Sequence, residues 1–296
     1  MAKVLLEIIN NISLLRKTIS EVKESNKSIG FVPTMGSLHQ GHLSLFKKSV
    51  LENDYTICSI YVNPTQFNNS QDFETYPRTN NKDVELLNSI NCDLLFLPTD
   101  REMYPEDERS KDYRFTEKIN LLEGEKRPGH FLGVITIVHK LFSLVQPNKA
   151  YFGEKDYQQL WIIKLFTKEF KLPIKIISCP TIRGENGLAL SSRNNNLSCS
   201  EKKDAGKLFE ALVFFKTELE KIKYNSSYCT PLSLINTKKN ALASIKKNPL
   251  IKLDYFEVID EENFSFANDI NYDRNYRILI AAYIGEIRLI DNMSLQ

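Results

Sequence analysis

Two of the four histidines in the sequence, His39 and His42, lie three residues apart in the segment PTMGSLHQGH. An apolar run ends at Pro33, Gly36 lets the backbone turn, and a helical pattern starts between His39 and Gly41. The first amides of a helix lack partners within the helix and carry partial positive charge, which favours an anion. Histidines at this spacing share one face of the first turn and can donate hydrogen bonds to phosphate oxygens. The segment therefore predicts a phosphate-binding helix start.

The residue pattern alone leaves two other roles for these histidines, as surface side chains or as metal ligands. A metal site is disfavoured, because no H-E-x-x-H pattern and no nearby third ligand accompanies them. Gly41 leaves space for a flat group such as adenine to lie against the backbone. We therefore favour a nucleotide over a metal ion.

Two further segments combine small, hydroxyl and charged residues. Residues 153–156, GEKD, lie between a strand-like run and a helical pattern, where a phosphate or a ribose can meet free amides. Residues 190–193, LSSR, offer two hydroxyls and a guanidinium, which suit a triphosphate. Taken by themselves, GEKD also fits an exposed turn with an ion pair, and LSSR also fits a flexible linker.

The elements that must position these residues alternate between strand-like and helical patterns up to about residue 180, which is typical of βαβ units around a parallel sheet. Beyond residue 200 the order is two helices followed by three strands, which suits a smaller α+β domain. We place the domains at residues 1–181 and 182–296. The predicted strands are 28–33, 55–62, 92–98, 149–152, 173–178, 252–259, 276–284 and 286–291, and the predicted helices are 42–53, 81–90, 131–145, 157–170, 201–223 and about 231–247.

Composition limits the classes of protein that remain. The net charge of +2 supplies no broad positive field for a nucleic acid. The five cysteines are scattered and form no C-x-x-C pair, so they predict neither a disulfide framework nor a zinc site. Asn10 and Asn11 interrupt the apolar N-terminal stretch, and no apolar run approaches the length of a membrane span. We expect a cytoplasmic protein.

The histidine segment resembles the H-x-G-H signature of the nucleotidylyltransferase superfamily, which class I aminoacyl-tRNA synthetases share in related form. Further segments narrow the resemblance to the pantothenate synthetase family, and they occur in the family's order from residue 28 to the C-terminus. These segments are VNPTQF, YPRT, RPGHFLGV, FGEKDYQQL, GLALSSRN and LIDN.

This resemblance implies a Rossmann-like α/β domain that binds nucleotide and pantoate, a smaller C-terminal lid domain, and a homodimer. It implies condensation of (R)-pantoate with β-alanine, using ATP and Mg²⁺, to give pantothenate, AMP and pyrophosphate through pantoyl adenylate. Catalysis would then come from positioning and from stabilising charge on phosphate oxygens. Neither a nucleic acid nor a membrane is an expected partner.

The resemblance also implies roles for individual residues. The catalytic residues would be His42, His39 and Lys155, and a low pKa of His42 at the helix N-terminus would favour a neutral donor. Pantoate would contact Gln66 and Gln159. The predicted ATP contacts are Met35, Gly36, Ser37, Leu38, His39, Gln40, Gly41, His42, Gly153, Glu154, Lys155, Asp156, Ile182, Leu190, Ser191, Ser192 and Arg193.

Two departures from the family pattern bear on these expectations. Leu132 follows RPGHF where many relatives have Arg, so a polar contact there must be absent or replaced. Asn80, Asn81 and Lys82 stand where some relatives carry acidic residues that help to hold the metal, although Asp83 remains. We therefore expect Mg²⁺ to bind mainly through ATP phosphates and water, and we assign no protein ligand.

Two alternative functions stay open at this stage. One is another H-x-G-H nucleotidyltransferase with a different substrate, against which VNPTQF, Gln66 and Gln159 argue. The other is a catalytically silent nucleotide- or RNA-binding relative of the tRNA synthetases. Such a relative should have lost catalytic positions, and the near-neutral charge offers RNA no obvious face. The positions that remain are His39, His42, Lys155, Ser191, Ser192 and Arg193.

Overall fold

The computed structural model describes residues 5–68, 70–105, 113 and 117–296. The chain divides into two compact units, Met1–Pro180 and Thr181–Gln296. The boundary expected from the sequence, between residues 181 and 182, lies one residue further along the chain. Each unit has its own hydrophobic core.

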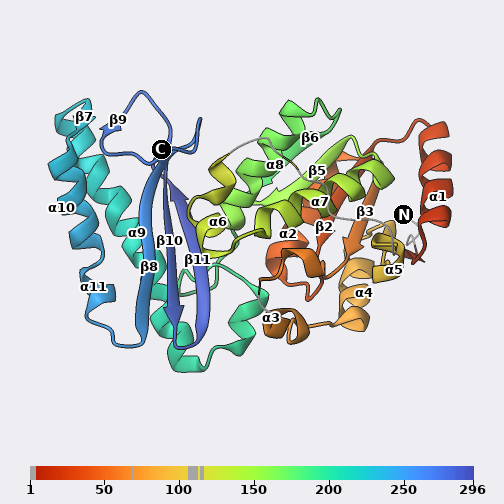
Figure 1. The fold of residues 1–296 in the computed structure, drawn as a ribbon, viewed down its shortest axis with the longest axis horizontal. Helices are drawn as coiled ribbons and strands as arrows, with labels where there is room; N and C mark the ends of the chain where they lie inside the picture. The colour runs from red at the N-terminus through yellow and green to blue at the C-terminus, as the bar shows by residue number, and fades with distance from the viewer. Residues whose placement is uncertain (1–4, 69, 106–112, 114–116) are drawn as a thin grey trace. The chain divides into compact units, whose positions relative to one another are not determined.

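A six-stranded parallel sheet forms the centre of the first unit (Figure 1). The strands are β1 (Glu7–Ile9), β2 (Ile29–Thr34), β3 (Tyr55–Ile60), β4 (Leu94–Phe96), β5 (Lys149–Gly153) and β6 (Lys175–Cys179). Their order across the sheet is β1-β4-β3-β2-β5-β6, which reverses between β2 and β5. Open α/β sheets bind ligands beyond the carboxyl ends of the strands at such a point. The expected Rossmann-like α/β class is confirmed.

Helices pack against both faces of this sheet. The helices of this unit are α1 (Ile12–Glu24), α2 (Gln40–Glu52), α3 (Ser70–Glu74), α4 (Asn80–Ser89), α5 (Asp100–Met103), α6 (Glu123–Lys126), α7 (His130–Val145) and α8 (Tyr157–Glu169), with 3-10 turns η1 (Pro64–Gln66), η2 (Glu117–Asn120) and η3 (Glu154–Asp156). Phe31 and Val32, adjacent in β2, point to opposite faces: Phe31 joins the apolar cluster of α1 and α7, and Val32 joins that of α2 and α4. The apolar stripe predicted within 131–145 is buried in α7.

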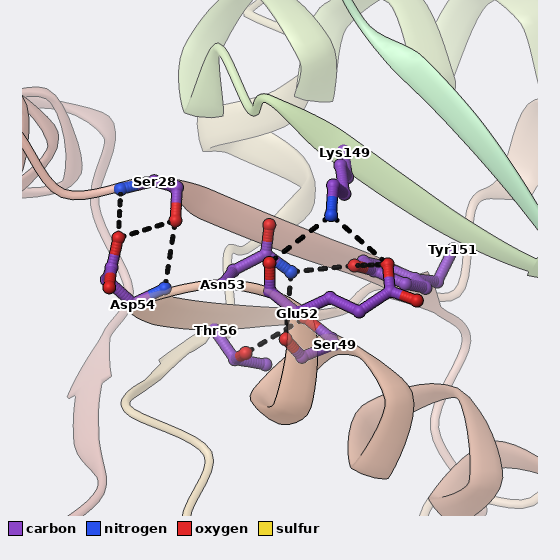
Figure 2. Close-up of polar contacts among 8 residues, drawn as sticks. All are labelled: Ser28, Ser49, Glu52, Asn53, Asp54, Thr56, Lys149 and Tyr151. Atoms are coloured by element: carbon purple, nitrogen blue, oxygen red, sulfur yellow. Dashed lines mark hydrogen bonds and ion pairs between the residues drawn. The ribbon is translucent and has the colours of Figure 1, made fainter.

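A polar network holds the carboxyl end of α2 against the sheet (Figure 2). Glu52 Oε2 accepts a hydrogen bond from Tyr151 OH at 3.0 Å, and Asn53 Nδ2 donates to the same hydroxyl at 2.7 Å. A Cβ added at Gly30 in β2 would overlap Ser49 Oγ of α2. Glycine at this position therefore lets α2 lie close to the strand whose end carries the histidine loop.

The second unit pairs a three-stranded antiparallel sheet with a long helix around one apolar core. Its elements are η4 (Ser192–Asn196), α9 (Cys199–Asn225), β7 (Tyr228–Cys229), α10 (Pro231–Ala241), α11 (Ala243–Lys246), β8 (Ile251–Asp260), β9 (Ile270–Asn271), β10 (Tyr276–Ile284) and β11 (Ile287–Ser294). The sheet has the order β11-β10-β8, and α9 is the long helix. The predicted helix near 231–247 is in fact two helices that meet at Leu242. No described helix in either unit has the length and apolar composition that crossing a bilayer requires.

Candidate active site

The structure brings His39, His42 and Lys155 together beyond the carboxyl ends of two adjacent strands. β2 leads into the loop that carries the histidines, and β5 leads into η3, which carries Lys155. The charges of Lys155 and Asp156 both act on the pKa values of His39 and His42. The three residues predicted to be catalytic thus converge at the point where the strand order reverses.

His39 and His42 form a capping box at the start of α2. The Gly41 amide donates to His39 Nδ1 at 3.1 Å, and the His39 amide donates to His42 Nδ1 at 3.4 Å. Because a backbone N–H can only donate, both Nδ1 atoms are unprotonated, and each neutral ring carries its proton on Nε2. Both rings therefore have one N–H left to donate to an anion.

The same two rings are held in the neutral form. Burial, with a smaller effect from the charge of His39, lowers the pKa of His42 to about 3. Burial, followed by the Lys155 ammonium, lowers the pKa of His39 to about 4, although Asp156 acts in the opposite direction. The expected neutral donor at His42 is thus supported, but burial rather than the helix N-terminus is the main cause.

A pH dependence follows from these values. Folding lowers the histidine pKa values below the unfolded value of about 6.5, so the unfolded chain binds more protons and stability falls as the pH drops from about 6.5 towards 4. Buried His130, whose pKa burial lowers to about 4, adds to this loss. We expect urea unfolding to show a lower free energy of unfolding at pH 5 than at pH 7. The rate of the chemical step in which the histidines act should show no decrease centred on about pH 6.5. Such a decrease in rate would contradict the assignment of His39 and His42 as neutral donors.

Most backbone amides of the histidine loop already donate hydrogen bonds to other groups of the protein. The Gly36 amide donates to Thr34 Oγ1 at 3.1 Å, and the amides of Ser37 and Leu38 donate to the Asp83 carboxylate at 2.9 and 2.8 Å. The predicted ATP contacts over residues 35–42 remain predictions. If they form, the imidazole Nε2–H groups are better placed than these amides to supply the donors.

Gln66, predicted to contact pantoate, lies in η1 beside the histidine loop. Its Nε2 donates to Met35 Sδ at 2.7 Å, and its Oε1 accepts from Asn63 Nδ2 at 3.3 Å. Two residues to which the sequence assigned no role, Asn63 and His130, support this glutamine, and His130 Nδ1 donates to the Gln66 carbonyl at 2.8 Å. Asn63 lies in the family segment VNPTQF and His130 lies in RPGHFLGV, so the resemblance could have indicated both residues.

Gln158 and Gln159, adjacent in α8, have different surroundings. Gln158 is 2% exposed, its Oε1 accepts from the Glu123 amide at 3.0 Å, and its Nε2 donates to the Leu121 carbonyl at 2.7 Å. Gln159 is partly exposed and makes no side-chain hydrogen bond to the described residues. The contact of Gln159 with pantoate therefore remains a prediction. The side chain of Gln158 instead holds backbone groups within the protein.

The remaining predicted ATP contacts, Ile182 and residues 190–193, lie in the second unit. The Leu190 amide donates to the Ile182 carbonyl at 2.9 Å, which closes a short hairpin. Arg183 clamps this hairpin through two hydrogen bonds to Asp291, at 2.5 and 2.9 Å, and Asp291 belongs to the family segment LIDN. Ser191 caps η4 by accepting from the Arg193 amide at 3.3 Å. The loop is therefore anchored to β11 of its own unit rather than being a loose linker.

The two departures have structural counterparts. Leu132 packs beside the apolar cluster that contains Phe131, Ile135 and Phe166, so an apolar residue suits its position. Asp83 binds loop amides, and Lys82 beside it is exposed. Among the described residues, no group of three or more His, Cys, Asp or Glu side chains could hold a metal ion.

Comparison with known proteins identifies the family. The family model of pantoate-beta-alanine ligase matches residues 7–294. The chain belongs to the pantoate-beta-alanine ligase family. Curated relatives of this ligase family include a pantothenate synthetase of Azobacteroides pseudotrichonymphae, 44% identical over 98% of this chain and 100% of the relative, and one of Thermosipho africanus, 40% identical over 97% and 99%.

Solved structures of this ligase family share the fold. Pantothenate synthetase from Thermus thermophilus has a TM-score of 0.87 and 36% identity, with 98% of this chain and 99% of that chain covered. Pantoate-beta-alanine ligase from Francisella tularensis, complexed with beta-gamma ATP and beta-alanine, has a TM-score of 0.77 and 39% identity, with 98% of each chain covered.

Proposed function

We propose that this protein is an AMP-forming pantothenate synthetase. It condenses (R)-pantoate with β-alanine at the expense of ATP, releasing AMP and pyrophosphate. Membership of the ligase family over residues 7–294 carries this conclusion. The meeting of His39, His42 and Lys155 at the reversal of strand order supports it.

The first step joins pantoate to the nucleotide. A pantoate carboxylate oxygen attacks the α-phosphorus of ATP, the bond to the bridging oxygen breaks, and pyrophosphate leaves. The Nε2–H groups of His39 and His42 donate to phosphate oxygens as negative charge builds up, and the Lys155 ammonium balances that charge. Because both rings stay neutral and keep their protons, they act as fixed donors.

The second step forms the amide. The amine of β-alanine attacks the acyl carbonyl of pantoyl adenylate, AMP leaves, and the amine loses a proton. Neither step requires a nucleophile from the protein, so rate acceleration rests on positioning and charge stabilisation. In support, the Francisella tularensis relative is complexed with beta-gamma ATP and beta-alanine.

Several finer features belong to the same proposal. Mg²⁺ accompanies ATP through the phosphates and water. The second unit acts as a lid whose residues 182 and 190–193 contact ATP and shelter the adenylate from hydrolysis. The working molecule is a cytoplasmic homodimer. The two hydrogen bonds from Arg183 to Asp291 hold the hairpin that carries Ile182 and Leu190 in one shape within the second unit.

A product assay tests the function directly. Purified protein with Mg-ATP and pantoate is expected to release one equivalent of pyrophosphate without β-alanine, and sustained AMP only when β-alanine is added. Absence of both products from a folded sample would reject the synthetase and favour the silent nucleotide- or RNA-binding relative. Product formation with a different acid in place of pantoate would favour another nucleotidyltransferase.

The adjacent glutamines of α8 provide a matched pair for the pantoate site. Gln159→Ala is expected to weaken pantoate binding about tenfold, as the loss of one hydrogen bond would, with little effect on ATP binding. Gln158→Ala should instead lower the free energy of unfolding by about 1–3 kcal/mol, because it leaves the buried Glu123 amide without its acceptor. Calorimetric titration and urea unfolding measure the two effects. Unchanged pantoate affinity in Gln159→Ala would remove that residue from the site.

A further inference from the structure

Asp83 of α4 is a completely buried carboxylate that holds main-chain groups of the histidine loop. Its exposure is 0%, and it accepts from the Ser37 amide at 2.9 Å, the Leu38 amide at 2.8 Å and Thr79 Oγ1 at 3.0 Å. Among the described residues it takes part in no ion pair. A buried carboxylate is tolerated only when hydrogen bonds replace its hydration, and here two loop amides and one hydroxyl do so.

The loop conformation depends on this contact. Gly36 has φ +81°, and Ser37 has φ +52°, in the left-handed region that a serine rarely adopts. This backbone turns the amides of Ser37 and Leu38 towards one point, as in the backbone nests that bind anions. A Cβ added at Gly36 would lie 3.1 Å from Asp83 Oδ2. The carboxylate therefore fills an anion-binding nest that would otherwise be left open.

The position of the histidines follows from the loop. The Leu38 amide, bound by Asp83, immediately precedes His39, which caps α2 and shares the capping box with His42. The other end of α2 is held separately by the network around Glu52 and Asn53 (Figure 2). The amino end of α2 thus depends on Asp83 for its placement, while the carboxyl end does not.

We propose that Asp83 is a positioning residue, whose carboxylate fixes the loop so that His39 and His42 present their Nε2–H groups to the phosphates of ATP. The inference rests on the proposed function. It assigns Asp83 a role different from metal binding, for which its buried oxygens, already engaged by three donors, are poorly placed. The side chain acts through the backbone and touches no reacting atom.

The test compares Asp83→Asn with Asp93→Asn. Asp93 also accepts a backbone amide, that of Thr56 at 2.7 Å, but it precedes β4 on the far side of β3 from the histidine loop. Asp83→Asn should slow single-turnover pyrophosphate release by about 10²-fold, the cost of misplacing a catalytic group by about 1 Å, with a smaller change in KM. Asp93→Asn should keep the wild-type rate. Thr79→Val removes the hydroxyl but keeps the contacts of Asp83 with the two loop amides, so it should lower the rate by a smaller factor. This variant replaces Asp83→Asn in the test if Asp83→Asn does not fold.

A second measurement does not depend on activity. Nitrogen-15 spectra of the imidazoles should show His39 and His42 as Nε2–H tautomers in the wild type and as mixed tautomers in Asp83→Asn. His130 is an internal reference, because its Nδ1 donates to a carbonyl and its ring is the opposite tautomer. Unchanged rate and unchanged tautomers in folded Asp83→Asn would overturn the inference, and a shift only in the Mg²⁺ requirement would replace it with a metal role. If the wild type is inactive but Asp83→Asn still changes the tautomers of His39 and His42, the proposed function is rejected while the positioning role of Asp83 is kept.

Discussion

His42→Asn is expected to lower the rate of pyrophosphate release by about 10²- to 10³-fold, the usual cost of removing one preorganised donor to a charged transition state. The asparagine oxygen lies near the position of Nδ1, so it can still accept from the His39 amide and preserve the helix cap. Nothing replaces the Nε2–H group. Single-turnover kinetics with Mg-ATP and pantoate measures the loss, and thermal unfolding shows whether the fold is retained.

His42→Gln is the matched control. Its amide nitrogen reaches near the position of Nε2, so it can restore the donor while giving up the acceptor for the His39 amide. We expect this variant to be faster than His42→Asn and less stable. Near-wild-type turnover in folded His42→Asn or His42→Ala would remove His42 from the catalytic set.

Gly133→Ala is expected to damage pantoate binding through the turn η1, which carries Gln66. Gly133 lies in α7 against η1, and an added Cβ would overlap the Thr65 carbonyl oxygen and lie 2.8 Å from Gln66 Cα. The Gly133 carbonyl also accepts from Asn63 Nδ2 at 3.1 Å. Overpacking of this kind costs about 1–3 kcal/mol and must displace either the helix or the turn that carries Gln66. A displaced Gln66 should weaken pantoate affinity by about tenfold or more.

The control for this variant lies on the same helix. Ser143→Ala removes an exposed hydroxyl that donates to the His139 carbonyl one turn away, so it should change neither pantoate affinity nor stability appreciably. Calorimetric titration with pantoate, alongside titration with ATP, separates a local effect from general damage. Equal loss of both affinities in Gly133→Ala would contradict a displacement confined to η1.

Much of the fold could be predicted because it depends on local patterns. The strands from β2 to β6, the buried stripe of α7 and the start of α2 follow from apolar periodicity and from Gly36 and Pro33, which are properties of neighbouring residues. β1 was not predicted, since a strand of three residues carries little pattern and exists through its pairing of Glu7 with Leu94. The break between α10 and α11 at Leu242 was not predicted either, because residues that favour a helix continue on both sides of it.

The candidate site likewise has features that local sequence determines and features that depend on tertiary contacts. The sequence by itself determined which groups are available: two histidines at a helix start, a lysine after a strand, and glutamines in recognisable segments. Only the tertiary structure decided how they are used. It selected the Nε2–H tautomers, lowered the histidine pKa values through burial, engaged Gln158 with the backbone of residues 121 and 123, and joined Asp83 to Ser37 across 46 positions of the chain. Residue type and period are local, whereas burial and hydrogen-bond partners depend on contacts between distant segments that no local pattern encodes.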